Sequence, residues 1–533
     1  MIDSLANVLL YICFSFLMGY FFLYALSANV RPALKEADRF LKILLILVPL
    51  LLLVPVIRVV ITLVQQFSVP LFEAITTVVL DYSTGQAFVL AIIISIIFLG
   101  SFPVLKGSWY SVILVFLLIV LASWSSHGAA VAGIFGFVGN TLHLVAVAIW
   151  IGILAVVGWF SLNNQNLRLF TRWFSFVAVG AVAVIIVSGF MLMSAIVPQY
   201  VQSWMLSYGQ LLLLKHILFL PLLVFGFHHL LLGVRKEQSN KEKISKSFQI
   251  ESVMALVIFT LSAFMTEQTP PHEVAQTLQT ESVSWVMQFF LSDPISIGSI
   301  KMSFSLVPVT LGVIGVFLFG YAARILIRSF LLQKSTAALG ASIFLFYLAL
   351  MLSVGGNGYD MDETVYESIS DAVSQTYEPS AKIDILVTEQ HEEEIHVVYT
   401  VNQHELVAEK VIQVEEGYQR LPAAMLTIGG TAVAEEKQKI RTFRVQSGNW
   451  HDEHYEYTYV TFGMIQEPNE VARVQIHYEG GSYISELDRQ TFLHVVSSNE
   501  NWDDRHPIDF LKDNGQVIET YARNVMEEGV YCH

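Results

Sequence analysis

The chain has 533 residues, of which 54% are hydrophobic, and a formal net charge of −15. Repeated apolar runs of about 20 residues are typical of a polytopic membrane protein, because that length spans the hydrocarbon core of a bilayer. After Gly356 there are 33 acidic and 12 basic residues, so an acidic domain follows a basic membrane part. This acidic balance argues against a partner that is a nucleic acid.

We predict two domains from this division. Residues 1–355 are expected to form an all-α polytopic membrane helix bundle, and residues 356–533 a mainly β, sandwich-like extracellular domain. About ten transmembrane helices are expected near 7–28, 41–64, 86–105, 108–126, 139–161, 172–196, 209–234, 248–267, 303–328 and 337–355. The apolar segment 66–85 carries Glu73 and Asp81, which predicts a re-entrant or interfacial piece.

The orientation follows from the basic residues, which lie in alternate loops. Five loops carry them: Arg31, Lys35 and Arg39; Lys106; Arg168 and Arg172; the cluster within 235–246; and Arg328 with Lys334. Since basic loops stay on the cytoplasmic side, a multi-pass cell-membrane protein with both termini extracellular is predicted.

The acidic tail has the pattern of a β domain. Runs of β-branched and aromatic residues are separated by Gly-, Asn- and Pro-containing turns, which is typical of a β-sandwich. Strands are expected near 381–389, 395–402, 406–415, 440–445, 455–462, 472–478 and 491–496, and a short helix near 515–526.

Polar and sulfur-containing side chains interrupt the apolar helices in one part of the membrane domain. With a helix expected to begin near Gly139, they share one depth near the outer face, at 1.5 Å per residue. Ionisable groups in hydrocarbon are costly and indicate a site or pathway, and soft thioether and imidazole ligands suit copper. The predicted metal ligands here are His127, His143, Met191, Met193 and His216, and Lys215 lies beside them.

Each of these residues also has a structural explanation. A membrane histidine can bond a neighbouring carbonyl, a methionine is usually packing, and Lys215 can pair with a carbonyl. His228 and His229 lie beside a basic loop, which favours contact with lipid headgroups. Carboxylates are scarce at membrane depth; Glu251 is the clearest, and a carboxylate proton relay is not predicted.

The tail holds nine of the chain's 15 histidines. His451 and His454 follow a Ser-Gly-Asn turn and flank two carboxylates, a set that fits Cu(II). His391 and His396 form a second candidate, although an extended strand would place them on opposite faces. The C-terminal Cys532 and His533 would suit Cu(I).

Four motifs in order resemble the copper resistance D family over about residues 120–235. They are Ser126-His127-Gly128-Ala129-Ala130; His143 through Trp150 to Gly152; Phe174-Ser175 through Ala178 to Ser188-Gly189; and Tyr208-Gly209 through Leu212 to Lys215. Two departures are the swapped order of His127 and Gly128, and Ile153 where the family usually has a second glycine. The family's extracellular copper-binding module is also missing.

The resemblance implies a copper transport protein of the cell membrane that takes copper inward. Its expected partners are the copper ion, the lipid membrane and an extracellular copper-binding protein. No P-loop, Gly-x-Ser-x-Gly or HExxH motif occurs, so no enzyme is predicted. Two alternatives remain: a b-type haem protein with His143 and His216 as axial ligands, and a copper-delivery or assembly factor that does not transport.

Overall fold

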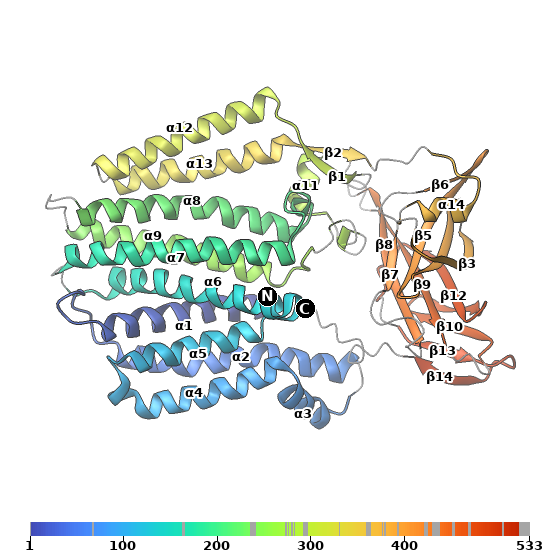
Figure 1. The fold of residues 1–533 in the computed structure, drawn as a ribbon, viewed down its shortest axis with the longest axis horizontal. Helices are drawn as coiled ribbons and strands as arrows, with labels where there is room; N and C mark the ends of the chain where they lie inside the picture. The colour runs from blue at the N-terminus through green and yellow to red at the C-terminus, as the bar shows by residue number, and fades with distance from the viewer. Residues whose placement is uncertain are drawn as a thin grey trace. The chain divides into compact units, whose positions relative to one another are not determined.

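The chain forms two compact units in a computed structural model (Figure 1). Met1–His272 and Ser303–Ser353 belong to a helical unit, and Glu273–Met302 and Val354–Tyr531 to a second unit. The structure describes residues 2–66, 69–162, 166–234, 241–271, 274, 277–278, 281, 283–291, 297–329, 331–358, 364–375, 377, 380–391, 394–420, 425–428, 438–449, 454–466, 471–503 and 506–521.

The helical unit contains every span that the sequence predicts. Its helices are α1 (Ile2–Ala25), α2 (Asp38–Gln66), α3 (Leu71–Asp81), α4 (Ser83–Leu105), α5 (Trp109–Trp124), α6 (His127–Phe160), α7 (Leu167–Ile196), α8 (Ser207–Val234), α9 (Lys241–Met265), α12 (Leu306–Ser329) and α13 (Leu332–Ser353). In the described part of the chain, nine helices are long and apolar enough to cross a membrane. The tenth, α5, is apolar but has 16 residues, about 24 Å at 1.5 Å per residue. The predicted polytopic helical bundle is confirmed.

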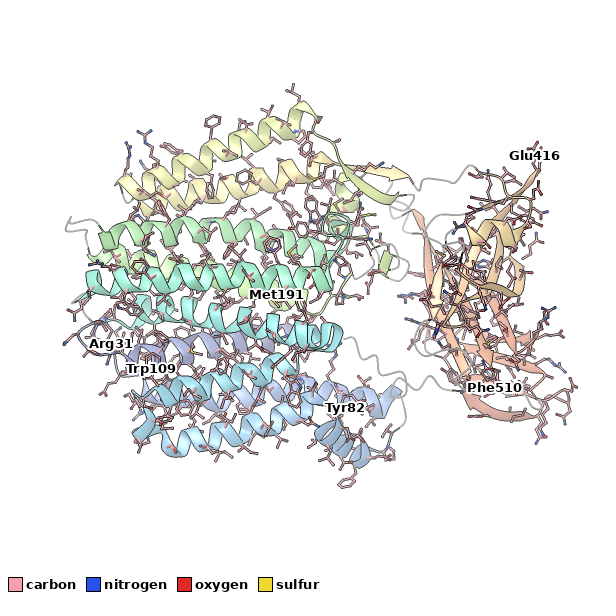
Figure 2. All side chains as sticks on the ribbon, viewed as in Figure 1. Arg31, Tyr82, Trp109, Met191, Glu416 and Phe510 are labelled. Carbon is pink, nitrogen blue, oxygen red and sulfur yellow. The ribbon has the colours of Figure 1, made fainter. Side chains whose placement is uncertain are left out.

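Three of the basic connections meet at one end of this bundle. Lys106, between α4 and α5, forms an ion pair with Asp38 at the start of α2. The backbone N–H of Lys35 donates to the Phe160 carbonyl at the end of α6 (2.8 Å), and the Trp173 indole donates to the Val30 carbonyl (2.7 Å). Figure 2 places Arg31 at this end and Met191 toward the other. The alternate loops therefore share a face, as the pattern of basic residues requires.

Helix α6 lies at the centre of the unit and packs against α1, α5, α7 and α9. Its run Trp150–Val157 is buried on all sides. A Cβ at Gly152 would lie 2.0 Å from the Ser15 carbonyl oxygen of α1, and one at Gly19 would lie 2.2 Å from Gly152. Two glycines thus allow the backbones of α1 and α6 to touch, which is how small residues join membrane helices.

The start of α6 differs from the prediction. The helix begins at His127 instead of Gly139, because the Ser126 side chain caps it by accepting from the Ala129 N–H. The helix then breaks at Ala132 and Gly133, where Gly133 has φ 53°. A positive φ is accessible to glycine without a steric penalty. The Gly- and Ala-rich stretch, expected to be a loop, is therefore a kinked extension of the helix.

The second unit contains strands in four sheets among the described residues. The pair β1 (Ile297–Met302) and β2 (Val354–Gly358) joins the segments before α12 and after α13. The other sheets, in spatial order, are β3 (Ile383–His391), β4 (Glu394–Val401), β5 (Glu405–Val414) and β6 (Gly417–Arg420), with β7 (Leu426–Ile428) on β5; β12 (Thr491–Ser498), β9 (His454–Ile465) and β8 (Gln438–Asn449); and β11 (Gly481–Glu486), β10 (Arg473–Tyr478), β13 (Ile508–Leu511) and β14 (Val517–Tyr521). Two short helices, α11 (Trp285–Phe290) and α14 (Ile369–Ser374), also belong to this unit.

The three larger sheets form layers, with the β12-β9-β8 sheet in the middle. On one face, Val460 and Phe462 pack with Val398 and Leu406 of the β3-β4-β5-β6 sheet. On the other face, Tyr459 packs in a cluster with residues of β10 and β13, including Val474, Ile476, Ile508 and Phe510. The predicted mainly β domain is confirmed, and its central sheet is covered on both faces.

The helix expected near 515–526 is wrong where the structure describes it. Val517–Tyr521 is the strand β14, which pairs with β13. Gly515, at φ 81°, turns the chain back after β13, and the Thr520 hydroxyl donates to Asp509 on the neighbouring strand (2.6 Å). Cross-strand pairing therefore overrides the local helical pattern.

Candidate functional site

The predicted membrane site lies where α6, α7 and α8 run side by side. His143 on α6 faces α7, and its Nδ1 lies 3.1 Å from the Ser188 hydroxyl oxygen. Gly189 comes next on α7, and a Cβ there would approach the His143 ring to 4.0 Å. The Ser188-Gly189 pair thus supplies both a hydrogen-bond partner and room for the imidazole.

The hydrogen bonds of Ser188 determine which nitrogen of His143 carries the proton. The Ser188 hydroxyl donates its proton to the Val184 carbonyl, at 2.7 Å. Since a hydroxyl has only one proton, its oxygen accepts from His143 Nδ1–H. The neutral ring then has its lone pair on Nε2. Metal-ligating histidines are commonly held in this way, with the other nitrogen bonded to a neighbour.

Met191 and Met193 lie on α7, outward of Ser188, and are half-buried. A Cβ added at Gly139 of α6 would lie 3.5 Å from the Met191 Cβ. The contact between Gly139 and Met191 is one helical turn from the contact between His143 and Ser188. A thioether and an imidazole thus occupy adjacent turns of the same α6–α7 interface.

His216 and Lys215 enter from α8. The Tyr200 hydroxyl, in the connection after α7, lies 2.8 Å from His216 Nδ1, and the two rings are in contact. Lys215 and His216 both lie within electrostatic range of the His143 imidazole. The structure therefore brings together His143, Lys215 and His216 from two helices, and Tyr200 is a member that sequence reasoning missed.

The start of α8 is fixed by the Tyr208-Gly209-Gln210 segment. A Cβ at Gly209 would lie 1.9 Å from the Ser203 carbonyl oxygen, so only glycine fits against the short helix η1 (Gln202–Met205). The Gln210 side chain donates to the Trp204 carbonyl (2.6 Å) and accepts from the Tyr347 hydroxyl of α13 (2.5 Å). These contacts hold the segment that presents Lys215 and His216.

Trp150 is a packing residue in this structure. It is 2% exposed, and its ring meets Phe219 of α8 edge-on at 6.2 Å. It joins α6 to α8 below the histidines.

Some predicted ligands lie outside what the structure describes. His127 is the first residue of α6 and His454 the first of β9, but their side chains are not described, and His451, Cys532 and His533 lie outside the described residues. In the described ranges, no group of three or more His, Cys, Asp or Glu side chains is arranged to hold a metal ion. A metal at the α6–α7–α8 site would thus depend on methionine sulfur as well as imidazole nitrogen.

The expected headgroup contact of His228 and His229 is wrong. Both imidazoles are 2% exposed. His229 Nδ1 lies 3.1 Å from a carboxylate oxygen of Glu251 on α9, and the Glu251 side chain is completely buried. A tertiary contact between α8 and α9 takes both groups away from the membrane surface.

His391 and His396 lie on adjacent strands of a hairpin, so they do not belong to one extended strand. Glu389 pairs with His396 and His391 with Glu394, which puts all four side chains on one face. The two imidazole rings are 6.3 Å apart, and His396 is buried. The turn thus reverses the separation that a single strand would impose.

We expect His396 to make the second unit sensitive to acid. Burial, with a smaller contribution from Lys410, lowers the pKa of His396 from 6.5 to about 3. The unfolded chain therefore binds a proton that the folded domain excludes, and stability present above pH 6.5 is lost as the pH falls toward 3. Amide hydrogen exchange of β4 in the full chain, corrected for intrinsic rates, should accelerate over this range. His396→Gln should flatten the response; a wild-type chain with constant protection from pH 7 to 4 would contradict it.

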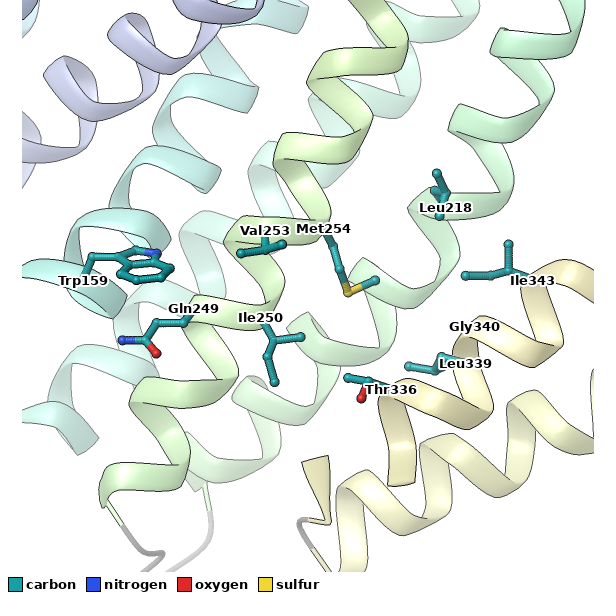
Figure 3. Close-up of a pocket in the computed structure, with 10 residues that line it drawn as sticks. All are labelled: Trp159, Leu218, Gln249, Ile250, Val253, Met254, Thr336, Leu339, Gly340 and Ile343. Atoms are coloured by element: carbon teal, nitrogen blue, oxygen red, sulfur yellow. The ribbon is translucent and has the colours of Figure 1, made fainter. Parts of the chain in front are cut away.

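An apolar pocket lies elsewhere in the helical unit, between the end of α6 and helices α8, α9 and α13 (Figure 3). Its lining includes Trp159, Leu218, Ile250 and Leu339, with the thioether of Met254 as its one soft donor atom. Such a surface suits hydrocarbon and offers a metal ion no imidazole.

Comparison with known proteins agrees with the site. Residues 168–265 match the family model described as Copper resistance protein D. The chain is also similar to the Copper transport protein CutJ of Bacillus subtilis (strain 168), with 29% identity over 181 residues. This alignment covers 32% of the present chain and 32% of the relative, so the chain spans about a third of that protein. No solved structure matches.

The matched segment runs from α7 to α9 and includes Ser188, Met191, Lys215 and His216. Nine membrane-length helices surround or continue it in the described part of the chain. Through this segment the chain belongs to the copper resistance D family.

Proposed function

We propose that this protein moves copper across the cell membrane through the site between α6, α7 and α8. The observation that carries the proposal is the orientation of His143, whose Nδ1–H is committed to Ser188 and whose Nε2 keeps its lone pair. Support also comes from the family match and from the copper transport relative.

The donors that this site offers favour Cu(I). His143 and His216 supply neutral imidazole nitrogen, and Met191 and Met193 supply thioether sulfur, which are soft or borderline ligands. Lys215 places an ammonium group within electrostatic range of the imidazoles. A nearby positive charge penalises a divalent ion more than a monovalent one, and it speeds release. His127 is proposed as an additional ligand at the entrance.

The proposed direction is inward. The basic connections at one end of the bundle are placed in the cytoplasm by the positive-inside rule, which puts Met191 near the outer face and the acidic second unit outside. The membrane potential favours inward movement of a cation by about 2.3 kcal/mol per charge per 100 mV. The acidic domain, with His451 and His454, would concentrate copper or receive it from an extracellular copper-binding protein.

The test is copper uptake by the purified full chain in sealed liposomes. With Cu(I) outside and an inside-negative potential, we expect copper to accumulate in proteoliposomes and not in empty liposomes. Copper bound to the protein without accumulation would exclude transport and leave a delivery role. A haem absorption band in the purified protein would favour the haem-protein alternative.

A further inference from the structure

A second ionisable group lies in the helical unit, at the other end of α8 from His216. The Glu251 side chain is 0% exposed, and its Oε2 is 3.1 Å from His229 Nδ1. The other ring nitrogen, His229 Nε2, is 2.9 Å from the Ser247 hydroxyl oxygen, and the Phe248 ring packs 4.4 Å from the imidazole. Within the described residues, Oε1 of Glu251 has no hydrogen-bond partner. A carboxyl group is thus enclosed with one imidazole beside it.

The hydrogen bonds of this pair accommodate two protonation states without moving a heavy atom. In one state His229 Nδ1–H donates to a Glu251 carboxylate while the Ser247 hydroxyl donates to Nε2, and the pair carries one negative charge. Adding one proton makes the pair neutral: His229 Nε2–H then donates to Ser247, and a single proton lies between Nδ1 and Glu251. Only the Ser247 hydroxyl must rotate.

No other buried charge in the described residues compensates the negative state. His228 is the remaining buried titratable group at this end of α8. The other charged side chains described on the helices packed around it are exposed at this end: Arg172 on α7, Lys246 on α9, Arg324 and Arg328 on α12, and Lys334 on α13. An isolated charge in such surroundings is costly, so the pair requires a cation.

We propose that Glu251 and His229 form a proton-binding site within the membrane domain, holding one exchangeable proton. The direct contact between carboxylate and imidazole leaves space for a proton, and no metal-binding group is arranged there in the described residues. The proton leaves to water as H⁺ and returns to the same pair.

The site also responds to copper, an extension that rests on the proposed function. His216 and His229 are 13 residues apart on α8, about 20 Å at 1.5 Å per residue. Repulsion between a bound copper cation and the proton at that distance weakens proton binding about fourfold at an effective dielectric constant of about 20. Copper should therefore lower the midpoint of the proton titration by about 0.6 pH unit.

The experiment is an infrared difference titration of the full chain in lipid nanodiscs, first without copper. We expect a protonated-carboxyl band that disappears as the pH rises, and that is absent in Glu251→Gln. The matched control Glu73→Gln, which alters an exposed carboxylate on α3, should keep the band. A band that persists in Glu251→Gln, or no titrating band in the wild type, would overturn the proposal.

A second variant covers the case in which Glu251→Gln does not fold. His229→Gln retains the carboxyl group but removes its partner, so the band should change frequency and midpoint; an unchanged titration curve would count against the pair. Adding Cu(I) then tests the extension separately. A proton titration that copper does not shift would overturn the coupling, while the proton site and the transport of copper are each decided by their own assay.

Discussion

Replacing His143 by alanine should lower the initial rate of copper uptake into proteoliposomes by at least tenfold. The substitution removes the Nε2 lone pair that Ser188 orients toward the space between the helices, and the loss of a ligand exceeds the 10- to 100-fold effect typical of outer-shell changes. Because the ring is partly exposed within its interface and bonds one hydroxyl, the protein should still fold.

Two neighbouring substitutions make this result interpretable. Leu142→Ala changes an exposed side chain beside His143 and should leave uptake unchanged. Ser188→Ala keeps the imidazole but removes its orienting partner, so uptake should fall by about tenfold. Normal uptake by folded His143→Ala protein would eliminate this histidine as a ligand.

Replacing Gly152 by valine should prevent α1 and α6 from packing, and so abolish the folded helical unit. The new Cβ would lie 2.0 Å from the Ser15 carbonyl oxygen and 3.0 Å from the Gly19 nitrogen, both of which are backbone atoms. Overpacking against a side chain costs about 1–3 kcal/mol, and backbone yields less readily. The measurement is the yield of monodisperse protein in detergent and its melting temperature.

Gly180→Val on α7 is the matched control, because no atom lies within 4 Å of a Cβ there. It should give normal yield and melting temperature. If Gly152→Val behaved in the same way, the close approach of α1 and α6 would not exist in the protein.

The helical unit could be predicted from sequence because lipid allows few alternatives: a chain of about 20 apolar residues must satisfy its own backbone as a helix. The start of α6 could not. The Ala- and Gly-rich residues after His127 have the composition of a loop, and only the cap at Ser126 and the left-handed conformation at Gly133 extend the helix through them.

The candidate site was predictable in part for a similar reason. His143 and His216 stand out because polar groups are rare in apolar helices. Their partners Ser188 and Tyr200 do not, since a serine or tyrosine is common near the end of a membrane helix. The pairing of His229 with Glu251 depends on how α8 packs against α9, and no local pattern encodes that contact.

In the second unit, alternation and turn residues located most strands, but they carry no information on which sheets cover one another. Tyr459 and Val460 are adjacent in β9 and belong to different cores. The same limit applies to His391 and His396, whose proximity depends on a turn between them.

The apolar core of the helical unit runs without interruption through α1, α2 and α4–α9. Phe174 and Phe248, inside the segment 168–265, share that core with Phe14 and Leu154 outside it. That segment is therefore a unit of ancestry rather than of folding. Excised or grafted onto another scaffold, it would leave an aromatic surface bare and would lack the imidazole that α6 contributes.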